Sequence, residues 1–184
     1  MAAESENPFW DFSLAVYNRP GVAEACLALQ DRRGLDVNLL LFCCWAGSVG
    51  RPLGPRDIAR LRGAVDDWQQ GIVGPLRAVR RRLKGLSDVA AGEGGALRQA
   101  VKDCELEAER IEQAMLHAAL AGLSTEPSEP ADPAACGAAN LTAYLQAASL
   151  EADPADRQDL EAILRGAFDG LAPEDAKRLL WRQI

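Results

Sequence analysis

The sequence of 184 residues has little of what local metal, redox or nucleotide chemistry needs. It contains a single histidine, His117, and five cysteines with no CxxC pair among them. Structural zinc sites usually draw their ligands from such closely spaced cysteines or histidines. A glycine-rich phosphate loop and a nucleophile motif are also missing from the sequence. We therefore assign no catalytic residue and no metal ligand, and we expect no cofactor.

Long apolar runs and an excess of basic charge are missing too. The longest apolar run, residues 39–46, is far shorter than the ~20 residues that span a bilayer. The first residues are acidic and polar, unlike a signal peptide. The net charge of −7 disfavours general nucleic-acid binding, which depends on neutralising phosphates. With an odd number of cysteines, these features predict a cytoplasmic protein with reduced thiols, no membrane span and no nucleic-acid partner.

Helical spacing of apolar residues dominates what is present, whereas alternating apolar and polar runs typical of strands are not found. We expect an all-α helical bundle. Three N-terminal helices over residues 8–48 form its core, and a long antiparallel helical hairpin over 55–123 packs on them. Together these make a main domain, 1–123. A linker rich in Pro, Ser and Glu follows over 124–137, and short helices over 138–184 dock on the main domain.

The third N-terminal helix is predicted to be the centre of this core. Asp36 can cap its first turn, and from 37 to 46 every residue except Asn38 is apolar. A helix that is apolar all round belongs inside a bundle. The adjacent Cys43 and Cys44 are therefore interpreted as buried packing thiols and not as a reactive pair.

Two heptad seams define the predicted hairpin, and they are expected to face each other, with Leu83 opposite Leu97 and Ile72 opposite Ala108. A four-residue step at Ile72 coincides with Gly71, Gly74 and Pro75, which predicts a kink or break there. A basic cluster over 77–84 would then lie along acidic residues over 103–109. The first seam comprises Ile58, Leu61, Val65, Trp68, Ile72, Leu76, Val79, Leu83 and Leu86, and the second Leu97, Val101, Cys104, Ala108, Ile111, Met115 and Ala118.

The N-terminal string FWDFSLAVYNRPGVAEACLALQDRRGLDVNLLLFCCWAG, residues 9–47, resembles the opening of a proteobacterial family of conserved proteins of unknown function. The resemblance extends more loosely to about residue 120. It implies a small soluble bacterial protein, and it brings no reaction, cofactor or catalytic residue with it.

The sharpest polar cluster is QDRRGLDVN, residues 30–38, at a tight connection between two helices. One interpretation is helix capping and charge pairing. The other is that Asp31, Asp36 and Asn38 lie at the mouth of a cavity lined by aromatic residues such as Trp45, where they bind a polar group or ion. Paired carboxyl groups can do acid and base work only when their environments differ.

These observations favour a non-enzymatic helical interaction or scaffold protein, whose partner is another protein or a second copy of the chain. The alternative is an enzyme or carrier that binds a small apolar ligand in a pocket capped by residues 30–38, because helical bundles build such sites without any local motif.

Overall fold

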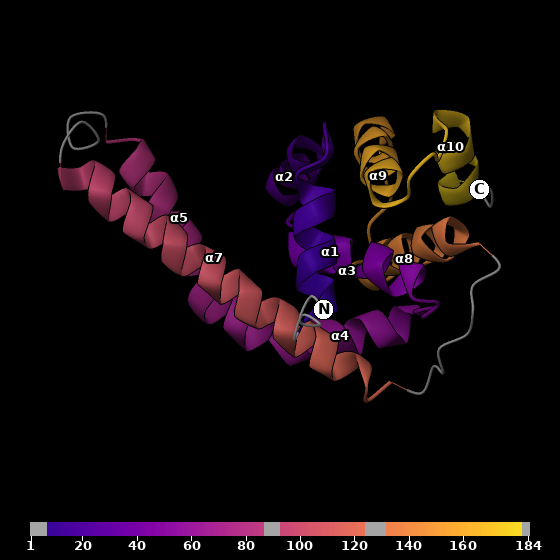
Figure 1. Cartoon of the computed structure of the whole chain (residues 1–184), viewed down its shortest axis with the longest axis horizontal. Coiled ribbons are helices and arrows are strands. Elements are labelled where there is room, and N and C mark those ends of the chain that lie inside the picture. Colours follow the sequence, from indigo (N-terminus) through magenta and orange to yellow (C-terminus); the bar gives the residue numbers. More distant parts are fainter. Residues whose placement is uncertain (1–6, 87–92, 124–131, 182–184) are drawn as a thin grey trace, which may run out of the picture.

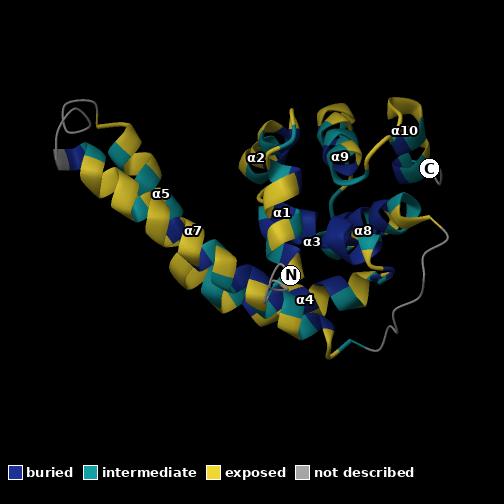
Figure 2. Ribbon diagram, viewed as in Figure 1, coloured by how far each residue is buried: buried dark blue, intermediate teal, exposed yellow. Residues whose placement is uncertain are grey.

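Helix α3 (Val37–Ser48) is the centre of the structure, a computed structural model that describes residues 7–86, 93–123 and 132–181. Every residue from 38 to 47 is buried, because neighbouring helices cover α3 on all sides (Figure 2). Among these neighbours are α1 (Pro8–Tyr17) and α2 (Val22–Arg33). The prediction that Cys43 and Cys44 are buried is confirmed, since both are wholly inaccessible.

Helix α8 (Pro133–Ala147) makes the most extensive contact with α3. The two helices approach closely at a pair of glycines, where a Cβ on Gly47 would lie 2.4 Å from the backbone nitrogen of Gly137. The buried Asn140 adds hydrogen bonds, accepting from the backbone N–H of Leu53 at 2.7 Å and donating to the carbonyl of Cys43 at 3.1 Å. This contact joins the C-terminal part of the chain to the central helix.

The start of α8 differs from the sequence-based boundary. Residues 133–137 are helical, although the linker was predicted to continue to 137. Asp132 accepts a hydrogen bond from the backbone of Ala135 at 3.0 Å and so caps the helix, and Pro133 takes the first position, where a missing N–H costs nothing. The rest of the predicted linker, 124–131, lies outside the described residues.

Two further helices complete the C-terminal part: α9 (Pro154–Ala167) packs mainly on α2, and α10 (Pro173–Trp181) packs on α8 and α9. Within the described ranges the chain forms helices and no strand, which confirms the all-α class. We call α1–α3 and α8–α10 the body. Figure 1 shows these six helices gathered on one side of the molecule.

The hairpin consists of α4 (Pro55–Trp68), a π-helical turn η1 (Gln69–Val73), α5 (Gly74–Lys84) and the long α7 (Glu93–Leu120). Helix α7 runs beside α4 and α5 and touches α1 and α3 through its C-terminal half. In Figure 1, α5 and the N-terminal half of α7 extend away from the body. We call this projecting part, α5 with residues 93–106 of α7, the arm.

The π-helical turn lies where the sequence predicted a kink. Gly74 donates its N–H to the carbonyl of Gln69, five residues earlier. Pro75 has no N–H and would press on a preceding carbonyl in a regular α-helix, so the wider turn relieves the conflict. The extra residue in this turn also changes which side chain faces the interior. Val73 is buried, whereas Ile72, the predicted seam residue, is exposed.

The prediction of a buried seam along the whole hairpin is wrong for the arm. Val79 is 48% exposed and Leu97 is 54% exposed, and Ile72, Leu86 and Cys104 are exposed as well. Two helices alone cannot enclose all apolar positions, and in the arm no third helix of the described chain covers them. The predicted seam is buried where α4 and α7 meet the body, at Ile58, Leu61 and Ala108.

Candidate functional site

The first turn of α3 holds a polar network that reaches three other helices, α1, α7 and α8. Asp36 caps the helix, since its Oδ1 accepts a hydrogen bond from the backbone N–H of Asn38 at 2.8 Å. Its own backbone N–H donates to the hydroxyl of Tyr144 on α8, also at 2.8 Å. The cap that the sequence predicted at Asp36 is thus present, and it is tied to the C-terminal helices.

Asn38 extends the network toward α7 and α1. Its amide nitrogen Nδ2 donates to Oε2 of Glu112 at 3.0 Å, and its oxygen accepts from Nε2 of Gln113 at 2.8 Å. Gln113 in turn accepts from the hydroxyl of Ser13 at 2.8 Å. Asn38, Glu112, Gln113 and Ser13 are all buried, so these hydrogen bonds fix how α1 and α7 pack on α3.

Glu112 is wholly buried, and its Oε1 receives no hydrogen bond from a donor. Burial raises the pKa of Glu112 to about 9, and the charge of Asp36 and a hydrogen bond to Asp36 add to the shift. A pKa in this range favours the neutral form of the Glu112 carboxyl group at neutral pH. The two carboxyl groups differ in environment, as acid and base pairs require.

A groove with a volume of about 340 Å³ lies between the body and the arm, on one side of this network. Asn38, Gln113 and Ser13 form part of its floor. Three of its apolar residues, Leu14, Leu27 and Leu106, are among the exposed large hydrophobic side chains of the molecule. We call it the apolar groove, and its apolar lining consists of Trp10, Leu14, Tyr17, Leu27, Val37, Leu41 and Leu106.

Charged residues of α5 and α7 form the arm-side wall of the apolar groove. Arg77 donates to Glu105 at 3.2 Å and to Glu109 at 2.7 Å, and Arg80 also pairs with Glu105. Burial raises the pKa of Glu109, although hydrogen bonding and the charge of Arg77 oppose the shift. Lys102 adds an exposed cation to this wall, so the lining carries more basic than acidic side chains.

A second cavity of about 320 Å³ lies on the other side of the Asp36 cap. It is more polar than the apolar groove, and Asp36 and Tyr144 of the network line it together with Arg33, Arg62 and Asp66. Residues 33–36 form one rim of this cavity, and Gln30, Val37 and Asn38 line the apolar groove. The connection over 30–38 thus separates the two cavities.

The four residues proposed from the sequence do not form one site. Asp36 and Asn38 lie together in the buried network. Asp31 is exposed and pairs with Arg81 of α5 at 2.6 Å, so it links α2 to the arm. Trp45 lies in an aromatic cluster with Phe9, Phe42 and His117, and it lines neither cavity.

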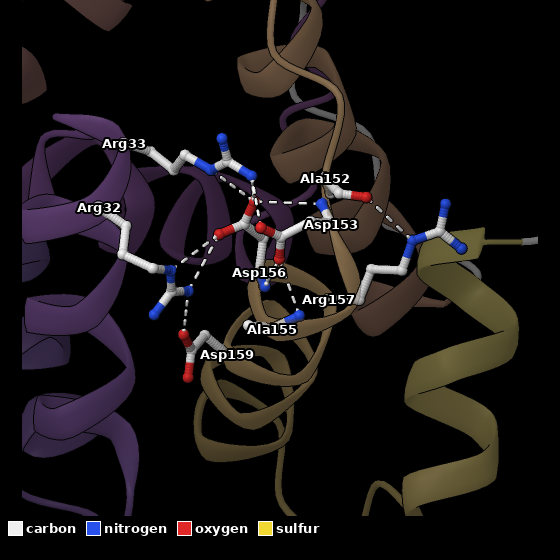
Figure 3. A network of polar contacts seen from close by, with 8 residues as sticks. All are labelled: Arg32, Arg33, Ala152, Asp153, Ala155, Asp156, Arg157 and Asp159. Atoms are coloured by element: carbon white, nitrogen blue, oxygen red, sulfur yellow. Dashed lines mark hydrogen bonds and ion pairs between the residues drawn. The ribbon is translucent and has the colours of Figure 1, made fainter.

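The arginines of the same polar stretch have a structural task (Figure 3). Arg32 and Arg33 at the end of α2 both pair with Asp156 of α9, and they also reach Asp159 and Asp153 respectively. Burial of Asp156 opposes its charge, but hydrogen bonds from Arg33 and Arg32 outweigh it and lower the pKa of Asp156. These ion pairs hold the C-terminal helices on α2.

Glu112 is the main residue that sequence reasoning missed. A signal for it exists, because Glu105 and Glu112 are seven residues apart and each lies beside a residue of the predicted second seam. Charged residues recurring with the period of a buried face indicate buried carboxyl groups that need partners. Glu105 finds them in Arg77 and Arg80, whereas Glu112 is held by Asn38 and Asp36.

The part of the chain that the structure describes lacks two kinds of feature. It contains no group of three or more His, Cys, Asp or Glu side chains arranged to hold a metal ion. Over the same described ranges, none of the helices combines the length and apolar character needed to cross a membrane.

Comparison with known proteins gives a family and no activity. No curated protein and no solved structure shows significant similarity to the chain. Residues 8–116 match the family described as "Protein of unknown function (DUF2390)", which is more than half of the sequence. The matched segment runs from α1 into the last turns of α7 and includes every residue that lines the apolar groove. The chain is therefore a member of the DUF2390 family, whose function is unknown.

Proposed function

We propose that the protein is a non-enzymatic interaction module of the cytoplasm, and that its apolar groove binds an acidic amphipathic helix of a partner protein. The observation that carries this proposal is the exposure of Leu14, Leu27 and Leu106 toward one groove from three different helices. Grouped apolar side chains that stay exposed on a folded protein typically mark an interaction site. The main domain 1–123 supplies the groove, and the C-terminal helices support it from behind.

The shape and chemistry of the groove favour a helix as its occupant. A volume of about 340 Å³ holds a few large side chains, as in recognition modes where a helix inserts residues at i, i+3, i+4 and i+7. The polar groups on the groove floor, Ser13, Asn38 and Gln113, already bond to each other or to Glu112. They therefore demand no polar partner from a ligand.

Charge favours an acidic partner. Arg77 and Arg80 are paired with Glu105 and Glu109 inside the wall, and the exposed Lys102 adds one further cation. A helix with carboxylates beside its leucines would approach this wall with favourable electrostatics. The chain as a whole carries −7, so the basic wall is a local feature against an acidic background.

The polar cavity offers weaker support for the alternative, a carrier of small apolar ligands capped by residues 30–38. Residues 33–36 form one rim of that cavity, but the charged side chains of Arg33, Asp36, Arg62 and Asp66 line it. An apolar ligand would have to strip water from these groups without replacing their hydrogen bonds.

The test uses a synthetic peptide with Leu at i, i+3, i+4 and i+7 and Glu between them, labelled for fluorescence anisotropy. We expect saturable binding to the full chain, and weaker binding of the matched peptide with Lys in place of Glu. Leu106→Glu should abolish binding, and Lys102→Glu should weaken it several-fold. Arg60→Glu, an exposed charge reversal on α4 outside the groove lining, should leave it unchanged.

Circular dichroism should show that each variant keeps its helicity. Equal affinity for the acidic and basic peptides, or binding that survives Leu106→Glu, would refute the proposal. Absence of any binding by the wild-type chain would also count against it.

A further inference from the structure

The arm carries a second apolar surface, on the side away from the apolar groove. It is made of exposed residues from both arm helices, from the π-helical turn η1 before α5 and from the turn that follows α5 (Figure 2). We call it the back stripe, and it comprises Ile72, Val79, Leu86, Leu97 and Cys104.

Helix geometry places the back stripe opposite the groove. Arg77 lines the groove from α5, and Val79, two residues later, points about 200° round the helix from it. On α7 the same relation holds between Leu106, which lines the groove, and Cys104. The apolar residues of the stripe are thus independent of the site under "Proposed function", and nothing in the described chain packs over them.

The exposed stripe follows the spacing of a helix-packing seam. Ile72 and Val79 are seven residues apart, as are Leu97 and Cys104. Heptad-spaced apolar residues normally pack against another helix. The two-helix arm leaves these heptad-spaced residues exposed on one face. A further layer of helices would be needed to cover them.

Charges beside the stripe indicate what supplies that layer. Arg82 lies three residues after Val79 and is exposed on the α5 edge. Asp103 and Glu107 are exposed on the α7 edge, where Glu107 is three residues after Cys104 and pairs with Arg110 at 2.6 Å, so this edge keeps a net negative charge. The stripe therefore has one basic edge and one acidic edge, each provided by a different helix.

We propose that the back stripe is the interface of a homodimer, in which two arms pack face to face as an antiparallel four-helix bundle. A twofold axis through the stripe places α5 of one copy over α7 of the other, so each Arg82 faces the acidic edge of the partner copy. Such a surface is complementary to itself, as isologous interfaces require. The two groove sites would then face outward on opposite sides of the bundle.

Sedimentation equilibrium on the full chain tests the dimer. The wild-type protein should be a dimer at micromolar concentration, and Val79→Glu should raise the dissociation constant by about tenfold or more, because it buries an unpaired charge. Leu106→Glu, a matched change on the groove side of the same arm, should leave the dimer intact. A wild-type monomer, or a dimer indifferent to Val79→Glu, would overturn the proposal.

Charge-reversal variants test the same dimer interface separately from any effect on folding. Arg82→Glu alone should weaken the dimer by like-charge repulsion, and so should the double change Asp103→Arg with Glu107→Arg. Combining all three should restore much of the affinity, because the edges are again opposite in sign. Failure of this restoration in variants with unchanged helicity would contradict the antiparallel arrangement.

Discussion

The two ends of α7 show how differently the body and the arm are built. Near its C-terminal end, Leu116 is wholly buried against the body, and near its N-terminal end Leu97 is 54% exposed. Both lie on one continuous helix of 28 residues. The body buries apolar residues on all sides of α3, whereas the arm presents apolar residues on two faces, toward the groove and along the back stripe.

The difference places the stability of the fold in the body and leaves apolar side chains of the arm accessible, as the proposed binding role requires. A helix end that packs in the core is stabilised because its apolar surface is buried. The gain in free energy is roughly 25 cal/mol per Å² of apolar surface removed from water. Apolar side chains that remain exposed contribute little to folding and are free to contact partners. The polar network around Asp36 and Glu112 lies at the junction of these two regions, where α7 leaves the body.

Replacing a leucine by alanine at each end of α7 should give the largest and most unequal changes in the free energy of unfolding. Leu116→Ala is expected to lower the free energy of unfolding by about 2 to 5 kcal/mol, because it leaves a cavity in the core. Leu97→Ala should change it by less than about 0.5 kcal/mol in dilute protein. Urea unfolding followed by circular dichroism measures both. Similar losses at the two positions would remove the distinction between body and arm.

The close contact of α3 and α8 gives the next largest effect. Gly47→Ala should destabilise the fold by about 1 to 3 kcal/mol, since its Cβ would overlap the backbone of Gly137. The matched control is Gly63→Ala on α4, where a Cβ meets nothing within 4 Å. That change should instead stabilise by up to about 1 kcal/mol through helix propensity. Thermal unfolding measures whether each change raises or lowers the stability. A Gly47→Ala variant as stable as the wild type would contradict the observed packing.

Glu112 makes stability depend on pH with a defined sign. Its pKa is about 9 in the folded state, whereas an unfolded Glu titrates near about 4.3. Between these values the folded state keeps a proton that the unfolded state has lost, so stability should fall as pH rises, by up to about 1.4 kcal/mol per pH unit. Glu112→Gln keeps the shape and the hydrogen bonds without a titrating proton. Relative to the wild type, its free energy of unfolding should rise by up to about 2.8 kcal/mol from about pH 6 to about pH 8, because only the wild type loses stability over this range.

Glu105 is the matched control for this experiment, because it is also buried on α7, seven residues earlier. Its carboxylate neutralises Arg77 and Arg80. Glu105→Gln should therefore destabilise by about 1 to 3 kcal/mol at neutral pH, opposite in sign to Glu112→Gln. Unfolding curves of both variants across this pH range provide the comparison. A wild-type protein whose stability rises over the same range would refute the protonated state of Glu112.

The smallest expected effect is at Asp31, whose exposed ion pair with Arg81 links α2 to the arm. Asp31→Asn should cost less than about 1 kcal/mol, because exposed ion pairs are weak and are screened by salt. Unfolding in low and high salt measures the change. A larger loss that persists in high salt would show that this pair is essential for holding the arm.

Much of the body could be predicted from the sequence, because local signals and burial agree there. The unbroken apolar run around Cys43 and Cys44 predicted a central helix, and Asp36 predicted where it begins. The boundary of α8 was misplaced because short residues, Ala134 to Ala138, resemble a linker when the contact that buries Gly137 is unknown.

The arm was predicted less well for a physical reason. Heptad spacing shows that apolar residues share a face, but not whether another helix covers that face. Val79 and Leu97 fit the seam pattern as well as Ile58 and Leu61 do, yet only the latter are buried. Glu112 was missed because its role depends on Asn38, 74 residues earlier in the chain.

Hydrogen exchange on the full chain, with and without the acidic amphipathic peptide, tests most directly whether the groove between body and arm is the binding site. We expect slow exchange in α3 and α8 in both states, and new protection on binding in α1, α2 and α7 around Leu14, Leu27 and Leu106. The matched lysine peptide should produce little protection. Protection confined to the back stripe or to the polar cavity, or no change on adding the peptide, would contradict the assignment of the apolar groove as the binding site.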